Sequence, residues 1–532
     1  MDIPYKAITG LAAVSSFAFV TYFPRVLPYS QPSYLGTFAQ IWGVEFSIGL
    51  FWYIILYPKF FSPLRHLPGP KGGTWWCGYF PEIIRKPSGE PMKEWANTIP
   101  NEGIIRYLSI FNTERLVIVS PKALSEVLTT KSYDFVKPSQ FRVGLGRLLG
   151  IGILLAEGDE HRTQRKNLMP AFAFRHVKNL LADETSVAKK ENVLEVGEWA
   201  SRTTLDIIGI AGMGQDFGSI RDPDALLSRT YRKVFTPSLG AQLLGFMALI
   251  LPSWFVHRLP FSRNDEIEKA AATIKDVCRQ LIRDKKEKLD NGRLTDIDIL
   301  SVALESGGFT EENLVNQMMT FLAAGHETTA TAMTWAIYML CLYPDVQSRL
   351  RKEIREHIPS IEDSTTITSQ EIDHLQYLNA VCNEVLRYYP PVPVTLREAV
   401  RDTVITGIAI PKGTRVMITP LAVNRNNELW GPDTQKFDPD RWLQSDSNPH
   451  SANGGAPSNY AFMTFLHGPR SCIGSGFARS EFACLLASWI GRFEFALEDE
   501  RLYDEKNLKI RGQATAKPAD GLLVKTKIIE GW

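Results

Sequence analysis

The stretch FLHGPRSCIG, residues 465–474, holds one cysteine between an arginine and a glycine. Gly468 and Gly474 permit a tight turn and the close approach of a flat ligand, and backbone amides beside Cys472 are able to stabilise its thiolate. A zinc site needs three or four ligands and an iron–sulfur cluster normally needs four cysteines, so a lone thiol fits neither. A haem iron takes a single thiolate, whereas most isolated cysteines are small buried apolar side chains. Other motifs in the chain have to decide between these two interpretations.

The composition is globular and carries almost no net charge. Of 532 residues, 44% are hydrophobic and 22% are charged, and the formal net charge is +1. A nucleic-acid partner is not expected, because no basic field is present to hold a polyanion. The six cysteines lie far apart without paired spacing, which argues against a disulfide framework and a structural zinc site. This cysteine usage favours a reducing compartment.

The N-terminal part is the exception to this composition. Residues 7–23 carry no charge, and a second apolar stretch from Leu35 to Tyr57 contains one charged residue, Glu45. A helix needs about 20 residues to span a bilayer, so both stretches are long enough. The strong basic start and clear cleavage site of a signal peptide are missing, and we therefore predict a retained membrane anchor in residues 1–65, with one or two transmembrane helices. Basic residues that favour the cytoplasmic side follow the second stretch: Lys59, Arg65, His66 and Lys71.

Downstream of the anchor the patterns are mainly helical. The segment HLPGPKGG, residues 66–73, breaks any helix and predicts a hinge before a catalytic domain over residues 66–532. Two β-rich runs around a Pro-Lys-Gly turn, residues 404–419, are the clearest strand signal. The expected fold class is mainly α with small β-sheets. One run with apolar residues at helical spacing contains the following positions: Leu375, Leu378, Val381, Val385 and Tyr389.

A second unusual stretch is FLAAGHETTATAMTW, residues 321–335, inside a long apolar helical run. Consecutive Gly, His, Glu and Thr residues are rare in a core helix, because buried polar groups need partners and a mid-helix glycine costs about 1 kcal/mol relative to alanine. Gly325 is expected to leave room for a diatomic ligand. A Thr328 hydroxyl bonded back to a carbonyl is expected to loosen the helix and to hold water.

A third motif pairs Glu384 with Arg387, three residues apart on one helix face. Such a pair is common on protein surfaces and is weak evidence by itself. The stretch FDPDRW, residues 437–442, adds Arg441 between this pair and the cysteine loop. The occurrence of all three motifs in this order along the chain is stronger evidence for a shared site than any one of them alone.

Taken together, these motifs resemble the cytochrome P450 family of haem-thiolate monooxygenases. The cysteine loop reads F-x-x-G-x-R-x-C-x-G, residues 321–335 contain A-G-x-E-T, and E-x-x-R and P-x-R precede the loop. The resemblance covers about residue 66 to the C-terminus, and the anchor is similar to that of the microsomal class. A P450 fold preceded by an N-terminal membrane anchor is therefore expected.

The resemblance implies haem b, iron protoporphyrin IX, as the cofactor. It implies that Cys472 is the axial iron ligand and so the metal-binding residue, that Phe465 packs near the sulfur within the loop framed by Gly468 and Gly474, and that Arg470 pairs with a haem propionate. The catalytic residues on the distal side of the haem are expected to be Ala324, Gly325, Glu327 and Thr328. Thr328 is expected to pass protons to bound dioxygen, with Glu327 as the relay. His326, between them, is not expected to bind iron.

Further residues are assigned to the haem pocket by the same resemblance. Glu384, Arg387 and Arg441 are expected to form a buried structural network. Arg397 lies where the family often places a propionate-binding residue, the alternative being an arginine on a strand edge. The family commonly has W-x-x-x-R in a haem-contacting helix, whereas this chain has His161 and Arg165 at that spacing, so these two either bind a propionate or belong to an exposed basic helix face.

The expected function is oxidation of a lipophilic small molecule with O2 and NADPH-derived electrons, in secondary-metabolite biosynthesis of the fungal kind. A membrane-bound NADPH–cytochrome reductase, membrane lipid and the endoplasmic reticulum membrane, with the catalytic domain facing the cytosol, are the implied partners and location. The nearly charge-free residues 240–261 are expected to roof the substrate channel, the alternative being a buried helix and turn. Further pocket residues expected near the haem are Val392, Val394, Thr395 and Leu396. A haem-thiolate isomerase, a peroxide-driven enzyme and a non-catalytic haem sensor are the alternatives, and the pair Glu327–Thr328 favours dioxygen activation over them.

Overall fold

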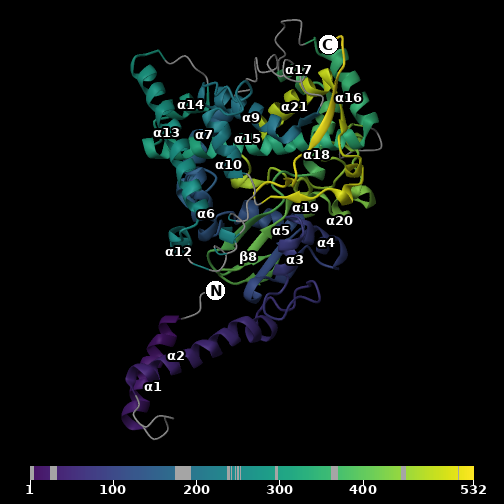
Figure 1. Cartoon of the computed structure of the whole chain (residues 1–532). Coiled ribbons are helices and arrows are strands. Elements are labelled where there is room, and N and C mark those ends of the chain that lie inside the picture. The colour runs from purple at the N-terminus through teal and green to yellow at the C-terminus, as the bar shows by residue number, and fades with distance from the viewer. Residues whose placement is uncertain are drawn as a thin grey trace.

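The N-terminal helices form a hairpin that projects from the rest of the protein (Figure 1). The computed structural model describes residues 5–23, 33–173, 193–235, 240, 243–245, 247, 251, 253–293, 298–360, 369–444, 451–512 and 514–532. Helix α1 (Tyr5–Tyr22) packs on α2 (Tyr34–Phe51), and the Trp42 indole donates to the Thr9 hydroxyl at 3.1 Å. Helix α2 continues into a π-helix, η2 (Trp52–Phe61). The combined helix Tyr34–Phe61 is exposed and is long and apolar enough to cross a membrane, and Lys6–Tyr22 is a shorter apolar helix.

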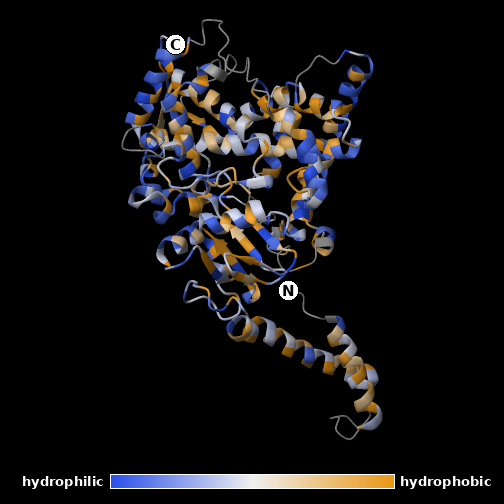
Figure 2. Ribbon diagram, turned by 180° about the vertical axis from the view of Figure 1, so that it is seen from behind, coloured by the Kyte–Doolittle hydropathy of each residue, from blue (hydrophilic) through white to orange (hydrophobic). Residues whose placement is uncertain are grey.

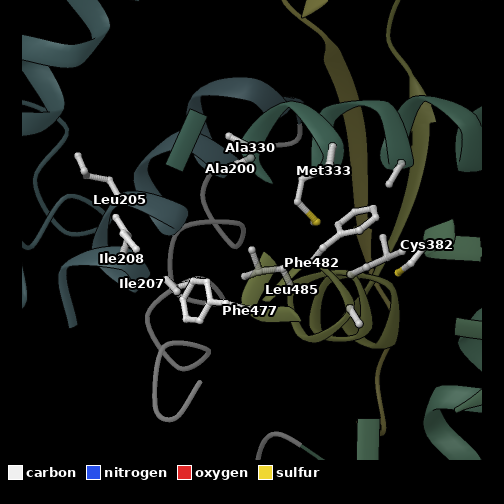
Figure 3. Close-up of a cluster of buried hydrophobic side chains, with 14 of the residues drawn as sticks. Ala200, Leu205, Ile207, Ile208, Ala330, Met333, Cys382, Phe477, Phe482 and Leu485 are labelled. Atoms are coloured by element: carbon white, nitrogen blue, oxygen red, sulfur yellow. The ribbon is translucent and has the colours of Figure 1, made fainter. Parts of the chain in front are cut away.

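The helical part of the protein is built around α15 (Glu311–Leu342). Thr310 caps the N-terminus of this 32-residue helix, and its hydroxyl accepts from the Asn313 amide at 3.2 Å. Most side chains of the helix are buried. The helices that pack against it include α9 (Val196–Met213), α18 (Gln376–Tyr388) and α21 (Ser475–Arg492). Figure 3 shows buried side chains from these four helices in one apolar cluster. A rigid centre of this kind fixes both α15 and the start of α21, the two elements that carry the central motifs.

A five-stranded sheet forms the second core. Its order is β1-β2-β8-β5-β3, with β2 and β8 parallel and the other pairs antiparallel. Figure 2 shows hydrophobic residues gathered in this sheet and along the N-terminal helices. The smaller sheets are β4-β12-β9, β6-β7 and β10-β11. The strands have these bounds: β1 (Ile104–Leu108), β2 (Glu114–Ile118), β3 (Phe135–Val136), β4 (Val193–Glu195), β5 (Thr395–Ala399), β6 (Thr403–Ile405), β7 (Ile408–Ile410), β8 (Arg415–Ile418), β9 (Phe493–Leu497), β10 (Ile510–Arg511), β11 (Lys517–Pro518) and β12 (Leu523–Ile528).

The remaining α-helices surround these two cores. They have these bounds: α3 (Phe80–Arg85), α4 (Glu90–Thr98), α5 (Pro121–Ser125), α6 (Ser139–Leu149), α7 (Gly158–Leu168), α10 (Leu226–Phe235), α12 (Ser253–Arg258), α13 (Ser262–Asp290), α14 (Ile299–Glu305), α16 (Pro344–His357), α17 (Ser369–Asp373), α19 (Pro420–Asn424) and α20 (Asn427–Trp430). The mainly helical fold with small sheets is therefore confirmed.

The two β-rich runs predicted within residues 404–419 form strands that belong to different sheets. The first β-rich run folds back on itself, because β6 and β7 turn at Thr406 and Gly407, both with positive φ. The second run, β8, leaves that hairpin and joins the large sheet next to β2. The Pro-Lys-Gly turn consequently connects two different sheets.

Candidate active site

The cysteine loop is held by a glycine that no other residue can replace without a shift. Gly468 has φ of +75°, and a Cβ on it would lie 2.2 Å from the Leu128 carbonyl oxygen. The Cys472 amide donates to the Phe465 carbonyl at 2.9 Å, which closes the loop. Gly474 follows and directly precedes α21. The loop therefore presents Cys472 from a rigid turn at the start of a buried helix.

The accessibility and the pKa of Cys472 together indicate that its side chain borders an internal hollow. The side chain is exposed, while the other five cysteines are buried or half-buried. Burial nevertheless raises the pKa of its thiol, and the Gly474 amide and Arg165 act in the opposite direction. A thiol that is accessible and yet desolvated faces space inside the protein.

Helix α15 also has a solvent-accessible stretch, at Ala324 and Thr328. Ala324 is exposed and Thr328 is half-buried, although the helix around them is buried. The Thr328 hydroxyl donates to the Ala324 carbonyl at 2.8 Å, which is the back-bonded arrangement that loosens a helix. Gly325 corrects one expectation: a Cβ there would meet Ile208 of α9 at 2.8 Å, so the missing side chain serves helix packing.

Glu327 and His326 both point away from this accessible stretch. Glu327 is buried, and its Oε1 accepts from the Thr515 hydroxyl at 3.0 Å and from the Lys517 ammonium at 2.8 Å. The His326 ring is fully buried, packs on Tyr231, and has Nδ1 2.6 Å from the Leu322 carbonyl oxygen. The buried ring of His326 therefore belongs to the packing between α15 and α10.

Buried cations gather beside the loop with too few anions to balance them. Arg470 pairs with Glu157, and, among the described residues, Nε and Nη1 of Arg470 are buried without a hydrogen-bond partner. Burial, and then the nearby charge of Arg470, lowers the pKa of Arg397 to about 10. Burial and the charge of Arg397 lower the pKa of Lys137 far below its usual value. Two arginines and a lysine thus share one carboxylate, and the two arginines alone exceed its charge.

Arg397 lies inside the large sheet. Its strand, β5, pairs with β8 on one side and with β3 on the other, and the side chain is 2% exposed. Its Nη1 donates to the Leu396 carbonyl at 2.9 Å and to the Thr395 hydroxyl at 3.1 Å. The interpretation of Arg397 as a strand-edge residue is therefore wrong.

Helix α7 places His161 and Arg165 near the same cluster. His161 is 4% exposed, its Nδ1 lies 3.2 Å from the Tyr133 hydroxyl, and burial lowers its pKa to about 4, with Arg470 adding to the effect. Arg165 is half-buried and donates to the Ser471 carbonyl at 2.7 Å. The interpretation of these residues as an exposed basic helix face is wrong for His161, and Arg165 contacts the cysteine loop directly.

The three residues of the expected structural network meet in one site, where Glu384 and Arg387 are fully buried and Arg441 is half-buried. Arg387 binds Glu384 through two hydrogen bonds of 2.8 Å, and the Arg441 Nε donates to the same carboxylate at 3.1 Å. The Trp442 indole and the Asp438 amide also donate to it, at 2.9 and 2.8 Å. Arg387 in turn donates to three backbone carbonyls: those of Asn424, Thr434 and Lys436.

The residues around the hollow fit a haem. One thiol is presented from a rigid loop, the opposite helix opens at Ala324 and Thr328, and the buried cations carry the charge opposite to that of two propionates. Val392, Val394 and Leu396, expected to line the pocket, are half-buried. Most of residues 240–261, the expected channel roof, lies outside the described residues.

The fold and this site define a haem-thiolate enzyme, and the chain belongs to the cytochrome P450 family, whose description, "Cytochrome P450", matches residues 67–522. It is similar over its length to named fungal enzymes. "Cytochrome P450 monooxygenase sphH" of Aspergillus fumigatus is 46% identical over 99% of this chain and 100% of its own. "Cytochrome P450 monooxygenase ALT8" of Alternaria alternata is 41% identical over 99% of both chains, and "FUM15" of Gibberella moniliformis is 44% identical over 90% of both. The protein is a cytochrome P450 monooxygenase with a haem-thiolate cofactor.

Several residues of the site were missed by the sequence reasoning. Lys137 and Glu157 join the cation cluster, and Lys517 binds Glu327. Glu481, nine residues after the cysteine, is fully buried on α21 and contacts Thr329 of α15 at 3.0 Å. For Glu481 the sequence does offer a signal, because a carboxylate stands in the apolar face of the helix after the cysteine loop. No sequence pattern indicates the roles of Lys137, Glu157 or Lys517.

Proposed function

We propose that Cys472 is the axial thiolate ligand of haem b and that Arg397 and Arg470 hold its propionates, with His161 and Arg165 beside them. The observation that carries this proposal is the accessible thiol in a desolvated hollow, next to two buried arginines that share one carboxylate. Phe465 closes the loop through its carbonyl, Gly468 lets the loop pass the Leu128 carbonyl, and Gly474 joins the loop to α21. Glu384, Arg387 and Arg441 stabilise the pocket from behind.

When bound, a thiolate-ligated haem supplies the binding of O2 and the cleavage of its O–O bond. The chain's own part is to deliver protons and to exclude stray water. Thr328 holds a water or a proton at the open face of α15, beside Ala324 and Gly325. Glu327 receives protons from the side of Lys517, whose ammonium is half-exposed and binds Oε1 of Glu327. Protons therefore enter the protein between α15 and the C-terminal β10–β11 hairpin.

The substrate we propose is a lipophilic small molecule of fungal secondary metabolism, since the named relatives are fungal monooxygenases and the pocket wall offers Val392, Val394 and Leu396. Residues 1–65 form the membrane anchor and residues 66–532 the catalytic domain, supported by the exposed apolar helix Tyr34–Phe61. The endoplasmic reticulum membrane, with the catalytic domain in the cytosol and an NADPH–cytochrome reductase as electron donor, completes this proposal.

The ligand assignment is tested by the spectrum of the reduced, carbon-monoxide-bound protein. Cys472→Ser removes the thiolate, and we expect loss of the red-shifted Soret band. Cys484→Ser, twelve residues further along and half-buried, is the matched control and is expected to keep the band. A Cys472→Ser protein that keeps the band would overturn the assignment.

The propionate assignment is tested by the rate at which haem leaves the protein for an acceptor apoprotein. Arg397→Met is expected to speed haem loss, because it removes a buried cation beside Arg470. Arg415→Met is the control on the neighbouring strand, where Arg415 is half-buried and pairs with Glu398 at 3.2 Å. Equal rates of haem loss in the two variants would remove Arg397 from the haem site.

A further inference from the structure

The end of the membrane helix has two backbone carbonyls that accept hydrogen bonds from side chains of the catalytic domain. Pro58 lies inside η2 and has no N–H, so it removes one backbone donor from this helix. The Asn112 side chain donates to the Ile54 carbonyl at 2.8 Å. The Pro58 carbonyl would pair in a π-helix with residue 63, which is also a proline, and the Arg106 guanidinium donates to it at 2.5 Å. Two side chains of the catalytic domain thus complete the hydrogen bonding of this helix.

Asn112 and Arg106 are themselves held in place from the other side. Asn112 also donates to the Trp75 carbonyl at 2.7 Å, and Arg106 donates from Nε to Glu114 at 2.7 Å. The Arg106 amide binds the Pro68 carbonyl at 2.8 Å, inside the segment predicted to be a hinge. Hydrogen bonds from Asn112 and Arg106 therefore join three parts of the chain: the helix end, the segment after it and the β1–β2 hairpin.

The backbone at Asn112 is strained in a way that favours a positioning role. Phe111 and Asn112 have φ of 52° and 51°, which is unusual for residues other than glycine. Such backbone conformations are strained and persist where the surroundings hold them. Asn112 is 2% exposed, so its two hydrogen bonds are made in a dry environment and resist competition from water.

The position of these contacts along the helix gives their depth in a membrane. At about 1.5 Å per residue, the helix from Tyr34 to Ile54 is about 30 Å long, which is the thickness of a hydrocarbon core. The Asn112–Ile54 and Asn112–Trp75 bonds therefore lie at the level where the hydrocarbon ends. Figure 1 shows helix α2 running from the N-terminal hairpin to the sheet region of the catalytic domain.

Aromatic side chains are exposed at this same level. Trp75 is 69% exposed, Trp76 is 46% exposed, and Phe111 is 38% exposed and lies 6.2 Å from Trp76 between ring centroids. Tryptophan is enriched where membrane meets water. Residues 52–81 contain no acidic side chain, which suits the surface of an anionic leaflet. A cavity of about 290 Å³, lined in part by Lys59 and Arg106, opens beside these residues and offers room for a lipid headgroup.

We propose that Arg106 and Asn112 fix the catalytic domain rigidly to its membrane helix, and that Trp75, Trp76 and Phe111 form a second contact with the lipid interface. This inference rests on the proposed membrane anchor. Two contacts on one rigid body give the catalytic domain a single tilt over the membrane. A lipophilic substrate then meets the same face of the enzyme whenever it leaves the bilayer.

The lipid contact is tested on the haem-loaded full-length protein in vesicles of phosphatidylcholine and phosphatidylserine that carry a photoactivatable diazirine phospholipid. We expect lipid adducts on peptides containing residues 34–61, 75–76 and 111. The double variant Trp75→Ser, Trp76→Ser is expected to lose the adducts at 75–76, while Tyr503→Ser, another exposed aromatic residue, is expected to change nothing. Adducts on 34–61 alone would overturn this inference, and no adducts on 34–61 would overturn the membrane anchor itself.

Rigid attachment is tested by linear dichroism of the haem in oriented stacks of nanodiscs. The native protein is expected to give a strong dichroic ratio, because one tilt is populated. Asn112→Ala and Arg106→Met are expected to reduce that ratio, and Arg85→Ala, an exposed arginine on the nearby helix α3, is expected to leave it unchanged. An undiminished ratio in both junction variants would show that these hydrogen bonds do not set the orientation.

Discussion

The Lys517 ammonium lies 2.8 Å from Oε1 of Glu327 and ties the acidic residue of α15 to the C-terminal β10–β11 hairpin. Glu327 is buried and Lys517 is half-exposed, so the pair connects the interior to solvent. The Thr515 hydroxyl donates to the same oxygen at 3.0 Å, which fixes the carboxylate in one orientation. The Thr328 hydroxyl, one residue along, is turned to the Ala324 carbonyl.

Removal of the carboxylate is expected to slow proton delivery. Positioned acid–base groups contribute about 10²–10⁴-fold, so Glu327→Gln is expected to lower the rate of product formation by about 10²-fold. The measurement is product formed per NADPH consumed, together with the solvent deuterium isotope effect. A Glu327→Gln enzyme with unchanged rate and isotope effect would exclude this residue from proton delivery.

Lys517→Met keeps the length of the side chain and removes the ammonium that orients Glu327. We expect a smaller loss than in Glu327→Gln, seen as less product per NADPH, because the carboxylate remains but is held only by Thr515. Lys525→Met is the control, since Lys525 is exposed on β12 and its partner Glu498 lies 3.3 Å away. If both lysine variants behave alike, the contact between Lys517 and Glu327 has no part in turnover.

Glu384→Gln is expected to be strongly destabilising. The carboxylate is fully buried and accepts from Arg387, Arg441 and Trp442, so its loss leaves Arg387 as an uncompensated buried charge. Breaking one partner of a buried pair costs about 3–5 kcal/mol. The urea midpoint of unfolding measures the effect.

The control for Glu384→Gln is a carboxylate in an exposed ion pair. Asp440 accepts from Arg349 at 2.8 Å, with both side chains at least half exposed. Exposed pairs contribute about 0–1 kcal/mol, so Asp440→Asn is expected to shift the urea midpoint little. Comparable shifts in the two variants would mean that Glu384 does not stabilise the pocket.

The parts of the site that the sequence predicts are those carried by short motifs. Gly468 and Cys472 stand in one loop, and Glu384 and Arg387 stand one helical turn apart, so local geometry already places them together. The helical face of α18 follows in the same way from the spacing of apolar residues such as Leu378 and Val385, both fully buried.

The parts that the sequence does not predict depend on contacts between distant segments. β8 pairs with β2 at Arg115 and Arg415, about 300 residues apart, so no local pattern indicates that the Pro-Lys-Gly turn leads into another sheet. Lys137 reaches Arg397 only because β3 and β5 are neighbours in that sheet. The charge cluster is thus a product of sheet topology.

Gly468→Ala is expected to destabilise the cysteine loop. A methyl group would lie 2.2 Å from the Leu128 carbonyl oxygen, and φ of +75° is costly for alanine. The fraction of purified protein that carries haem measures the effect and is expected to fall. Gly476→Ala is the control in the same region, because nothing lies within 4 Å of its Cβ position in α21, and alanine favours a helix by about 1 kcal/mol.

Glu481 offers a titration that reports on the packing of α21 against α15. Burial raises the pKa of its carboxyl to about 8, and its contact with the Thr329 hydroxyl opposes this only in part. Oε1 is buried and, within the described residues, has no hydrogen-bond partner. The carboxyl is therefore protonated at neutral pH in the folded protein.

The pH dependence of stability follows from the proton on Glu481. In the unfolded protein the Glu481 carboxyl loses this proton near pH 4.5, whereas in the folded protein it keeps the proton up to about pH 8. Raising the pH through this window favours the unfolded state, so stability falls across it and levels off above. Glu481→Gln abolishes this fall, and the melting temperature of the variant relative to the native protein is expected to rise from pH 5 to pH 8. Glu494→Gln, an exposed carboxylate 3.7 Å from Lys527, is expected to show no such trend, and a flat difference for Glu481→Gln as well would show that Glu481 is ionised in the fold.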